Sequence, residues 1–266
     1  MKKILFLTFI AICISIITPS SMYALDITLG ATTWYAQSEQ YYTQNKDAYY
    51  MQDAPIKSEP AFLYGPTLAV RLSNDFSLTF VFLYGTFKTK RDYGTLKSDS
   101  KYWRNDSDLV LNYKLNDYFK IFAGVKYFSY AITPADTDNS TFRIKKIDAH
   151  TSYGAGTGLS ATVPLVGSLF CLGTVSGLYL WGTDKVKIED YSTGNNKRSV
   201  NNGYNEYGIN STLSLAYYIA PASTVISLGG RFQYLMADYK KNDIYLDSIK
   251  FTIYGVTLTA TYTFSI

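Results

Sequence analysis

The C-terminal segment, residues 248–266, constrains the fold of this chain more than any other feature. From Tyr254 onward every second residue is apolar or aromatic, and the residues between them are small and mostly hydroxylated. The first set is Tyr254, Val256, Leu258, Ala260, Tyr262, Phe264 and Ile266, and the second is Gly255, Thr257, Thr259, Thr261, Thr263 and Ser265. Alternation at period two predicts a β-strand with one face in an apolar environment and the other in a wetter one.

Strand-like segments recur along the chain, and the joints between them alternate in length. We predict about ten strands, at 26–37, 60–73, 76–90, 102–115, 118–131, 147–163, 168–183, 204–219, 224–238 and 248–266. Short joints (74–75, 116–117, 164–167 and 220–223) alternate with long polar ones (38–59, 91–101, 132–146, 184–203 and 239–247). This alternation predicts one closed antiparallel transmembrane β-barrel, all-β, with tight turns at one end and long loops at the other. A soluble β-sandwich has no reason to alternate in this way.

The N-terminus predicts export. Lys2 and Lys3 precede an apolar stretch at 4–17, and Ala24 is a small residue at a plausible cleavage point. We therefore expect a signal peptide at 1–24 and a barrel domain at 25–266, the alternative being an uncleaved anchor. Of the two cysteines, Cys13 lies in the signal and Cys171 stands alone, so the mature chain cannot form an internal disulfide. A closed, fully hydrogen-bonded barrel can hold such a chain together without one.

Residues 151–183 carry no charge, so a transmembrane helix is an alternative for this stretch. It contains Pro164 and seven glycines, which are poor helix formers. A hairpin of two membrane strands that turns at 164–167 fits these residues better.

The alternation also predicts which side chains enter the lumen. A charge on the lipid face at mid-depth costs about 2–4 kcal/mol, so the polar face of each strand should point inward. On the fourth, fifth and sixth predicted strands these lumen residues are Asp106, Asp108, Lys126, Asp148, His150 and Ser152. We expect Asp106, Asp108, Lys126, Asp148 and His150 to form one network near the outer end. Aromatic residues make up 17% of the chain, enough for girdles at both membrane interfaces.

These features together resemble the bacterial outer-membrane β-barrel superfamily, over the whole mature chain. Tyr262, Phe264 and Ile266 resemble the C-terminal signal read by the barrel-assembly machinery, which usually ends in Phe. The resemblance implies a barrel in the outer membrane, reached by export through the inner membrane. It implies contact with outer-membrane lipid and lipopolysaccharide, and with the assembly machinery during biogenesis.

Two hydrolase families offer a catalytic interpretation of the lumen residues. Asp106/Asp108 and Asp148/His150 resemble the paired groups of the omptin proteases, but here the pairs come from strands only two apart instead of opposite walls. The run of His150 and Ser152 resembles that of the outer-membrane lipid hydrolases, although Thr162 stands where those enzymes carry Asn or Glu. The favoured interpretation is a salt-bridged lumen without catalysis, because charges in a narrow barrel must be paired.

The sequence therefore predicts a non-enzymatic barrel that acts as a narrow pore, or as a structural or binding surface protein through its tyrosine-rich outer loops. The alternative is a surface hydrolase with Asp106, Asp108, Asp148, His150 and Ser152 as candidate catalytic residues. No phosphate-binding loop or metal-ligand motif is present, so we expect no cofactor or metal. The mild net charge of +4 predicts no nucleic-acid partner. A small solute or surface ligand is left unidentified.

Overall fold

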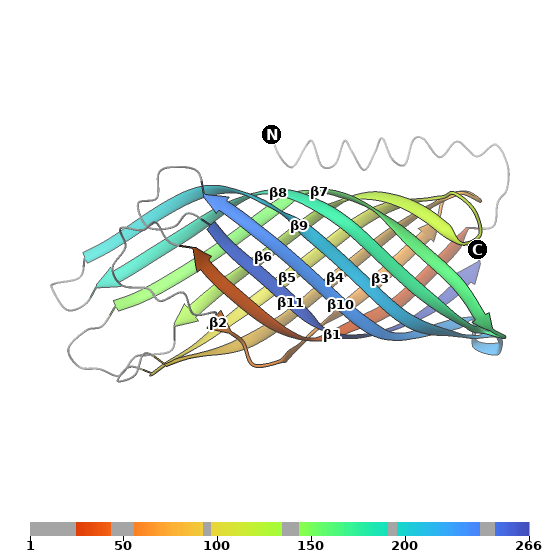
Figure 1. Ribbon diagram of the computed structural model, residues 1–266, viewed down its shortest axis with the longest axis horizontal. Coiled ribbons are helices and arrows are strands. Elements are labelled where there is room, and N and C mark those ends of the chain that lie inside the picture. The colour runs from red at the N-terminus through yellow and green to blue at the C-terminus, as the bar shows by residue number, and fades with distance from the viewer. Residues whose placement is uncertain are drawn as a thin grey trace.

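The computed structural model describes residues 25–43, 56–92, 97–134, 144–190, 196–239 and 248–265. The predicted signal at 1–24 and parts of the predicted outer loops lie outside the described residues. The described chain forms one antiparallel sheet that closes on itself as a barrel (Figure 1). Its strands are β1 (Asp26–Thr43), β2 (Ile56–Lys57), β3 (Ala61–Arg71), β4 (Phe76–Asp92), β5 (Lys97–Lys114), β6 (Phe119–Pro134), β7 (Ile144–Val166), β8 (Leu169–Asp190), β9 (Asn196–Ile219), β10 (Thr224–Tyr239) and β11 (Ser248–Ser265).

Pairing between the first and last strands closes the barrel. β1 lies antiparallel to β11 along its whole length, from Asp26↔Ser265 to Thr43↔Ser248. From β3 to β11 each strand pairs with the next in chain order, and β2 and β3 both pair with β1. The prediction of a single closed antiparallel barrel is therefore confirmed.

β2 and β3 together act as one wall strand, which makes the barrel ten-stranded. Ala36 of β1 pairs with Ala61 of β3, whereas Glu39 pairs with Lys57 of β2, so the β2–β3 side carries one extra residue. Such an extra residue is a β-bulge, which interrupts the ladder without ending the strand. Pro60 lies at the interruption, where its missing N–H costs no ladder hydrogen bond.

The uncharged stretch forms the β7–β8 hairpin, so the helical alternative is wrong there. Within the described ranges the only helical element is the 3₁₀ turn η1 (Ala220–Ala222). None of the helical structure in those ranges is long and apolar enough to cross a membrane.

Most strands run further than predicted, and this corrects the loop assignments. β1 continues to Thr43 inside the predicted loop 38–59, and β8 and β9 occupy most of the predicted loop 184–203. A membrane strand needs about 9–11 residues, whereas β7, β8 and β9 have 23, 22 and 24. The polar, charged composition of these segments indicated loops because it rules out contact with lipid. It is equally compatible with a sheet that continues into water.

The four short turns lie at one end, here called the turn end, at the right in Figure 1. In two of them a side chain holds the backbone. Ser73 Oγ accepts hydrogen bonds from the N–H groups of Asp75 and Phe76, and Asn116 Oδ1 accepts from those of Tyr118 and Phe119 at 2.9 Å. Among described residues other than glycine, only Ser223 has a positive φ, so side-chain capping and not a left-handed backbone holds these two turns.

The outer wall is apolar and carries two aromatic belts. Between the belts, Val125, Leu213 and Val256 are 57%, 64% and 51% exposed, an arrangement suited to lipid rather than water. The belt toward the turn end includes exposed Phe76, Tyr113, Phe119, Tyr217 and Tyr262. The belt toward the opposite, far end includes exposed Tyr35, Phe62, Tyr64, Tyr84, Trp103, Tyr127, Tyr153, Tyr179, Trp181, Tyr207 and Tyr254. On β11 the belts are Tyr254 and Tyr262, about one membrane thickness apart for tilted strands.

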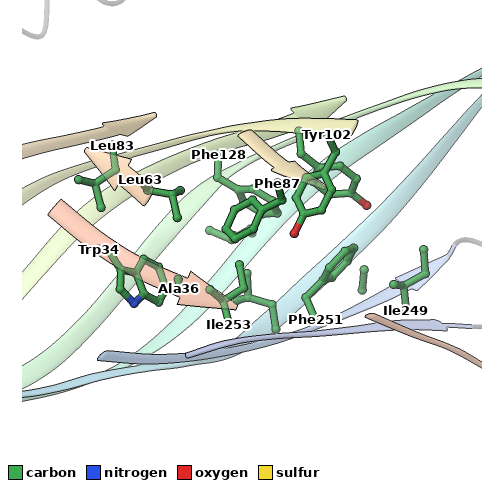
Figure 2. Packing of buried hydrophobic residues seen from close by; sticks show 14 of the residues in the cluster. Trp34, Ala36, Leu63, Leu83, Phe87, Tyr102, Phe128, Ile249, Phe251 and Ile253 are labelled. Atoms are coloured by element: carbon green, nitrogen blue, oxygen red, sulfur yellow. The ribbon is translucent and has the colours of Figure 1, made fainter. Parts of the chain in front are cut away.

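The lumen differs between its two ends. In the turn-end half, the inward residues are mainly threonine, serine and glycine, and are partly exposed; Thr28, Thr32, Thr259 and Ser214 are examples. In the far half, large apolar side chains point inward and pack against one another (Figure 2). This closing layer consists of Trp34, Ala36, Leu63, Leu83, Phe87, Tyr102, Phe128, Tyr130, Leu180, Tyr204, Leu235, Ala237, Ile249, Phe251 and Ile253. Our rule that apolar faces meet lipid and polar faces meet the lumen is therefore wrong for the far half.

Candidate functional site

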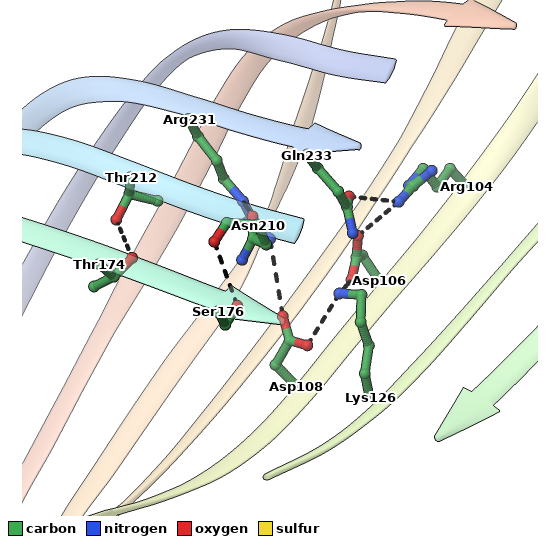
Figure 3. A network of polar contacts seen from close by, with 10 residues as sticks. All are labelled: Arg104, Asp106, Asp108, Lys126, Thr174, Ser176, Asn210, Thr212, Arg231 and Gln233. Atoms are coloured by element: carbon green, nitrogen blue, oxygen red, sulfur yellow. Dashed lines mark hydrogen bonds and ion pairs between the residues drawn. The ribbon is translucent and has the colours of Figure 1, made fainter. Parts of the chain in front are cut away.

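A polar network crosses the lumen directly beside the closing layer (Figure 3). At its centre is Asp106 on β5, whose two carboxylate oxygens accept from different cations. Arg104 Nη2 donates to Asp106 Oδ2 at 2.9 Å, and Lys126 Nζ of β6 donates to Oδ1. The same Arg104 nitrogen donates to Gln233 Oε1 on β10 at 2.9 Å, across the barrel. Arg104, Asp106 and Lys126 are at most 3% exposed. Burying each charge costs desolvation free energy, and the ion pairs among the three offset that cost.

Asp108 marks the side of this network that water reaches. Its side chain is 23% exposed, whereas that of Asp106, the preceding lumen-facing residue of β5, is 1% exposed. Lys126 Nζ donates to Asp108 Oδ1 at 3.0 Å, and Arg231 Nη2 lies 3.9 Å from Asp108 Oδ2. Arg231 also donates to Asn210 Oδ1 at 3.2 Å, and its guanidinium lies 4.5 Å from the ring centroid of Trp34. The solvated half of the lumen therefore ends between Asp108 and Asp106.

A second polar group sits within the closing layer. Ser152 Oγ of β7 donates to Glu206 Oε2 of β9 at 2.7 Å and lies 2.7 Å from the hydroxyl of Tyr204. The intervening strand, β8, has Gly182 at this point. A Cβ at Gly182 would lie about 2 Å from the Tyr204 ring, so the glycine makes room for Tyr204 to reach across β8 to Ser152.

His150 lies in an aromatic stack. Its ring is 4.4 Å from that of Tyr130 and 4.2 Å from that of Tyr204, at interplanar angles of 19° and 17°. The side chain is 1% exposed, and neither ring nitrogen has a hydrogen-bond partner among the described residues. The contacts of His150 are those of a packed aromatic side chain.

The structure brings together several of the predicted lumen residues. Asp106, Asp108 and Lys126 form one connected cluster, while His150 and Ser152 lie buried in the adjacent aromatic layer. Asp148 pairs through its backbone with Ile132 and Val186, but its side chain lies outside the described residues.

Sequence reasoning missed four important members of the site: Arg104, Tyr204, Glu206 and Gln233. Gln233 alternates with the exposed Phe232 on β10, so the rule for polar faces places it inward, but no partner was predicted for it. Arg104 lies two residues before Asp106 and therefore on the same face of β5. The alternation alone could have identified it as a lumen residue. Tyr204 and Glu206 share the inward face of β9, a strand for which we assigned no faces. The Arg104–Gln233 bond joins strands far apart in the sequence, so no local pattern reports it.

The described side chains of the candidate catalytic residues are not hydrogen-bonded to one another as a nucleophile and its base would be. A general base must reach the group it deprotonates, at about 2.6–3.2 Å or through one water. His150 makes no such bond to Asp106, Asp108 or Ser152, and Ser152 is fully buried, with Glu206 as its acceptor. In the part of the chain that the structure covers, no group of three or more His, Cys, Asp or Glu side chains is placed to hold a metal ion.

Comparison with known proteins gives matches only at the level of structure. No family model matches the chain, and no curated protein matches it in sequence. The outer-membrane protease OmpT from Escherichia coli matches with a TM-score of 0.52 at 13% identity, over 93% of this chain and 100% of that one. The translocator domain of the autotransporter NalP from Neisseria meningitidis gives 0.46 at 9% identity, over 98% and 96% of the chains. A major outer membrane protein from Thermus thermophilus gives 0.43 at 13% identity, over 91% and 100%.

At such low identity, the likeness to OmpT shows the fold and not the activity. It agrees with what the structure shows independently, namely a closed ten-strand wall with an apolar exterior between two aromatic belts. The chain has the fold of the outer-membrane β-barrels.

Proposed function

We propose that this protein is a non-enzymatic barrel of the outer membrane whose lumen is closed near the outer surface. On this proposal it acts as a structural or binding surface protein through its far end, and not as a steadily open pore. The turn end, which carries both ends of the barrel domain, faces the periplasm, and the far end faces outward. Lipid and lipopolysaccharide surround the wall, and the last strand, with Tyr262 and Phe264, is read by the assembly machinery.

One observation carries this proposal: the largest inward side chains of the far half are completely buried. Trp34, Phe87 and Phe128 are each 0% exposed, although they point into the lumen. A water-filled pore would leave its lining side chains in contact with solvent. With about ten strands the interior is only slightly wider than the side chains that fill it, so aromatic residues converging from many strands can close it.

Planar-bilayer recording tests the closure directly. We expect the purified, folded protein to insert without giving a steady conductance, because no water-filled path crosses the layer around Phe128. Insertion is verified independently by protease protection of liposomes made with the same lipids. A steady, ohmic conductance that scales with the amount of inserted protein would contradict the closed lumen and favour the narrow pore.

Thiol accessibility tests where the closure lies. In a Cys171→Ser background, we compare Ser214→Cys, which is partly exposed in the turn-end half, with Ser152→Cys, which is 0% exposed. A small cationic thiosulfonate should modify residue 214 at least about tenfold faster than residue 152, since the latter reacts only through local opening. Equal rates would show that water passes the closing layer.

A further inference from the structure

Two lysines lie directly opposite each other inside the turn-end mouth of the lumen. Lys114 of β5 pairs in register with Lys120 of β6. Both occupy the inward face, because Phe119 and Ile121 on either side of Lys120 are 48% and 40% exposed to the outside. Like charges directly opposite on antiparallel strands destabilise a sheet. Either something else must bring a negative charge to this pair, or the barrel bears the cost.

A third cation, Arg71 at the end of β3, lies at the same mouth. Arg71 has the same inward phase on β3 as Leu63 of the closing layer, and β4 separates β3 from β5, which carries Lys114. Arg71 pairs in register with Ser77 of β4, and Ser77 with Asn112 of β5, so a hydroxyl and an amide group lie between the cations. Lys120 itself pairs in register with Ser160 of β7. The mouth therefore combines three positive charges with neutral hydrogen-bonding side chains.

The carboxylates at this end do not neutralise Lys120. Asp26 lies 2.7 Å from Arg71, and Asp117 lies 2.7 Å from Lys114. The Lys114 ammonium beside Asp117 lowers the pKa of that turn carboxyl from its usual value, as expected for a carboxylate already engaged. Asp75 lies in the neighbouring turn, where its carbonyl oxygen accepts from Lys114 N–H. Among the described residues, neither Asp75 nor Lys120 makes a side-chain ion pair.

We propose that the turn-end mouth of the lumen binds a phosphate group, held by Lys120 and Lys114 with Arg71 beside them. Ammonium and guanidinium groups are the usual protein partners of phosphate, and Lys120 is a cation of this mouth that no described carboxylate pairs with. The phosphate could belong to a soluble anion of the periplasm or to a phospholipid headgroup at the inner rim. This site is independent of the closing layer, so it stands whether or not the lumen conducts.

The first experiment uses inorganic pyrophosphate as the probe and the folded protein in zwitterionic micelles. Calorimetric titration should show binding that Lys120→Gln weakens at least about tenfold, since that variant removes the cation without a carboxylate partner. The matched control is Lys101→Gln. Lys101 also faces a lysine in register, Lys88, but both are exposed on the outer wall. This control should leave pyrophosphate binding unchanged.

The second experiment separates the two sources of phosphate. Nanodiscs that contain phosphatidylglycerol or only phosphatidylcholine are compared for retained lipid after purification. Pyrophosphate binding that depends on Lys120 assigns the site to a soluble anion. Absent pyrophosphate binding with Lys120-dependent retention of phosphatidylglycerol assigns it to the lipid headgroup. If neither depends on Lys120, or if Lys101→Gln has the same effect, the proposal is wrong.

A stability measurement guards against a misfolded variant. Without phosphate, Lys120→Gln should unfold at a higher urea concentration than the wild type, because the opposed like charges are gone. With pyrophosphate present, the difference should shrink or reverse, because only the wild type gains stability from the bound anion. A variant that is less stable without phosphate would contradict the unfavourable pairing on which the site rests.

Discussion

Replacing Asp106 with Asn should cost the barrel about 3–5 kcal/mol of unfolding free energy, the range measured when one partner of a buried ion pair is removed. The side chain keeps its shape but loses the charge that holds Arg104 and Lys126. Both cations are about 2% exposed, so neither can turn to water for compensation. Urea unfolding of the protein in micelles, followed by tryptophan fluorescence and by gel mobility, measures the loss.

Asp108→Asn is the matched control for this prediction. Asp108 accepts from the same lysine at 3.0 Å, but its side chain is 23% exposed and solvent screens it. We therefore expect a loss of only about 1 kcal/mol for this substitution. Adding Lys126→Met to Asp106→Asn should recover part of the loss, because it removes a buried ammonium that would be left with only the partly exposed Asp108 as its counter-charge. Equal losses for Asp106→Asn and Asp108→Asn would show that the difference in burial between the two carboxylates does not affect the free energy of unfolding.

The parts of the fold that could be predicted are those whose outer face is apolar. There each strand must alternate between apolar and polar residues. Residues 254–264 of β11 therefore predicted at once that the segment is a strand, which of its faces points outward and which part of it lies at membrane depth. The extension toward the far end could not be predicted in this way. Beyond Trp181 the outer face of β8 carries charged residues such as Lys185. On a face exposed to water, such residues are as compatible with a strand as with a loop.

The closing layer could not be predicted from the sequence for a different physical reason. Phe251 and Ile253 point inward, whereas Tyr254 and Val256 on the same strand point outward. A buried lumen and a lipid bilayer select the same apolar residue types, so composition cannot distinguish them. Only a phase change in the alternation, between Ile253 and Val256, reports the switch. The contact of Tyr204 with Ser152 above Gly182 depends on three adjacent strands and has no local sequence pattern at all.

His150 provides the second large effect that we expect. His150→Ala removes a ring stacked between Tyr130 and Tyr204 and leaves a cavity in a layer with no exposed surface. Truncation of buried aromatic side chains to Ala costs about 3–5 kcal/mol, and we expect a loss near the lower end of this range because imidazole is smaller than a phenyl ring. Urea unfolding in micelles again measures it.

His150→Phe separates a packing role from a catalytic one. Phenylalanine preserves an aromatic ring at this position, and no hydrogen bond is lost because neither imidazole nitrogen has a partner among the described residues. We expect this variant to stay within about 1–2 kcal/mol of the wild type, since modest overpacking is the only cost. A barrel that stays fully stable as His150→Phe but loses a peptide- or lipid-cleaving activity would show that the imidazole acts chemically. If instead stability follows ring size and no such activity is found, the only histidine of the chain serves to close the lumen.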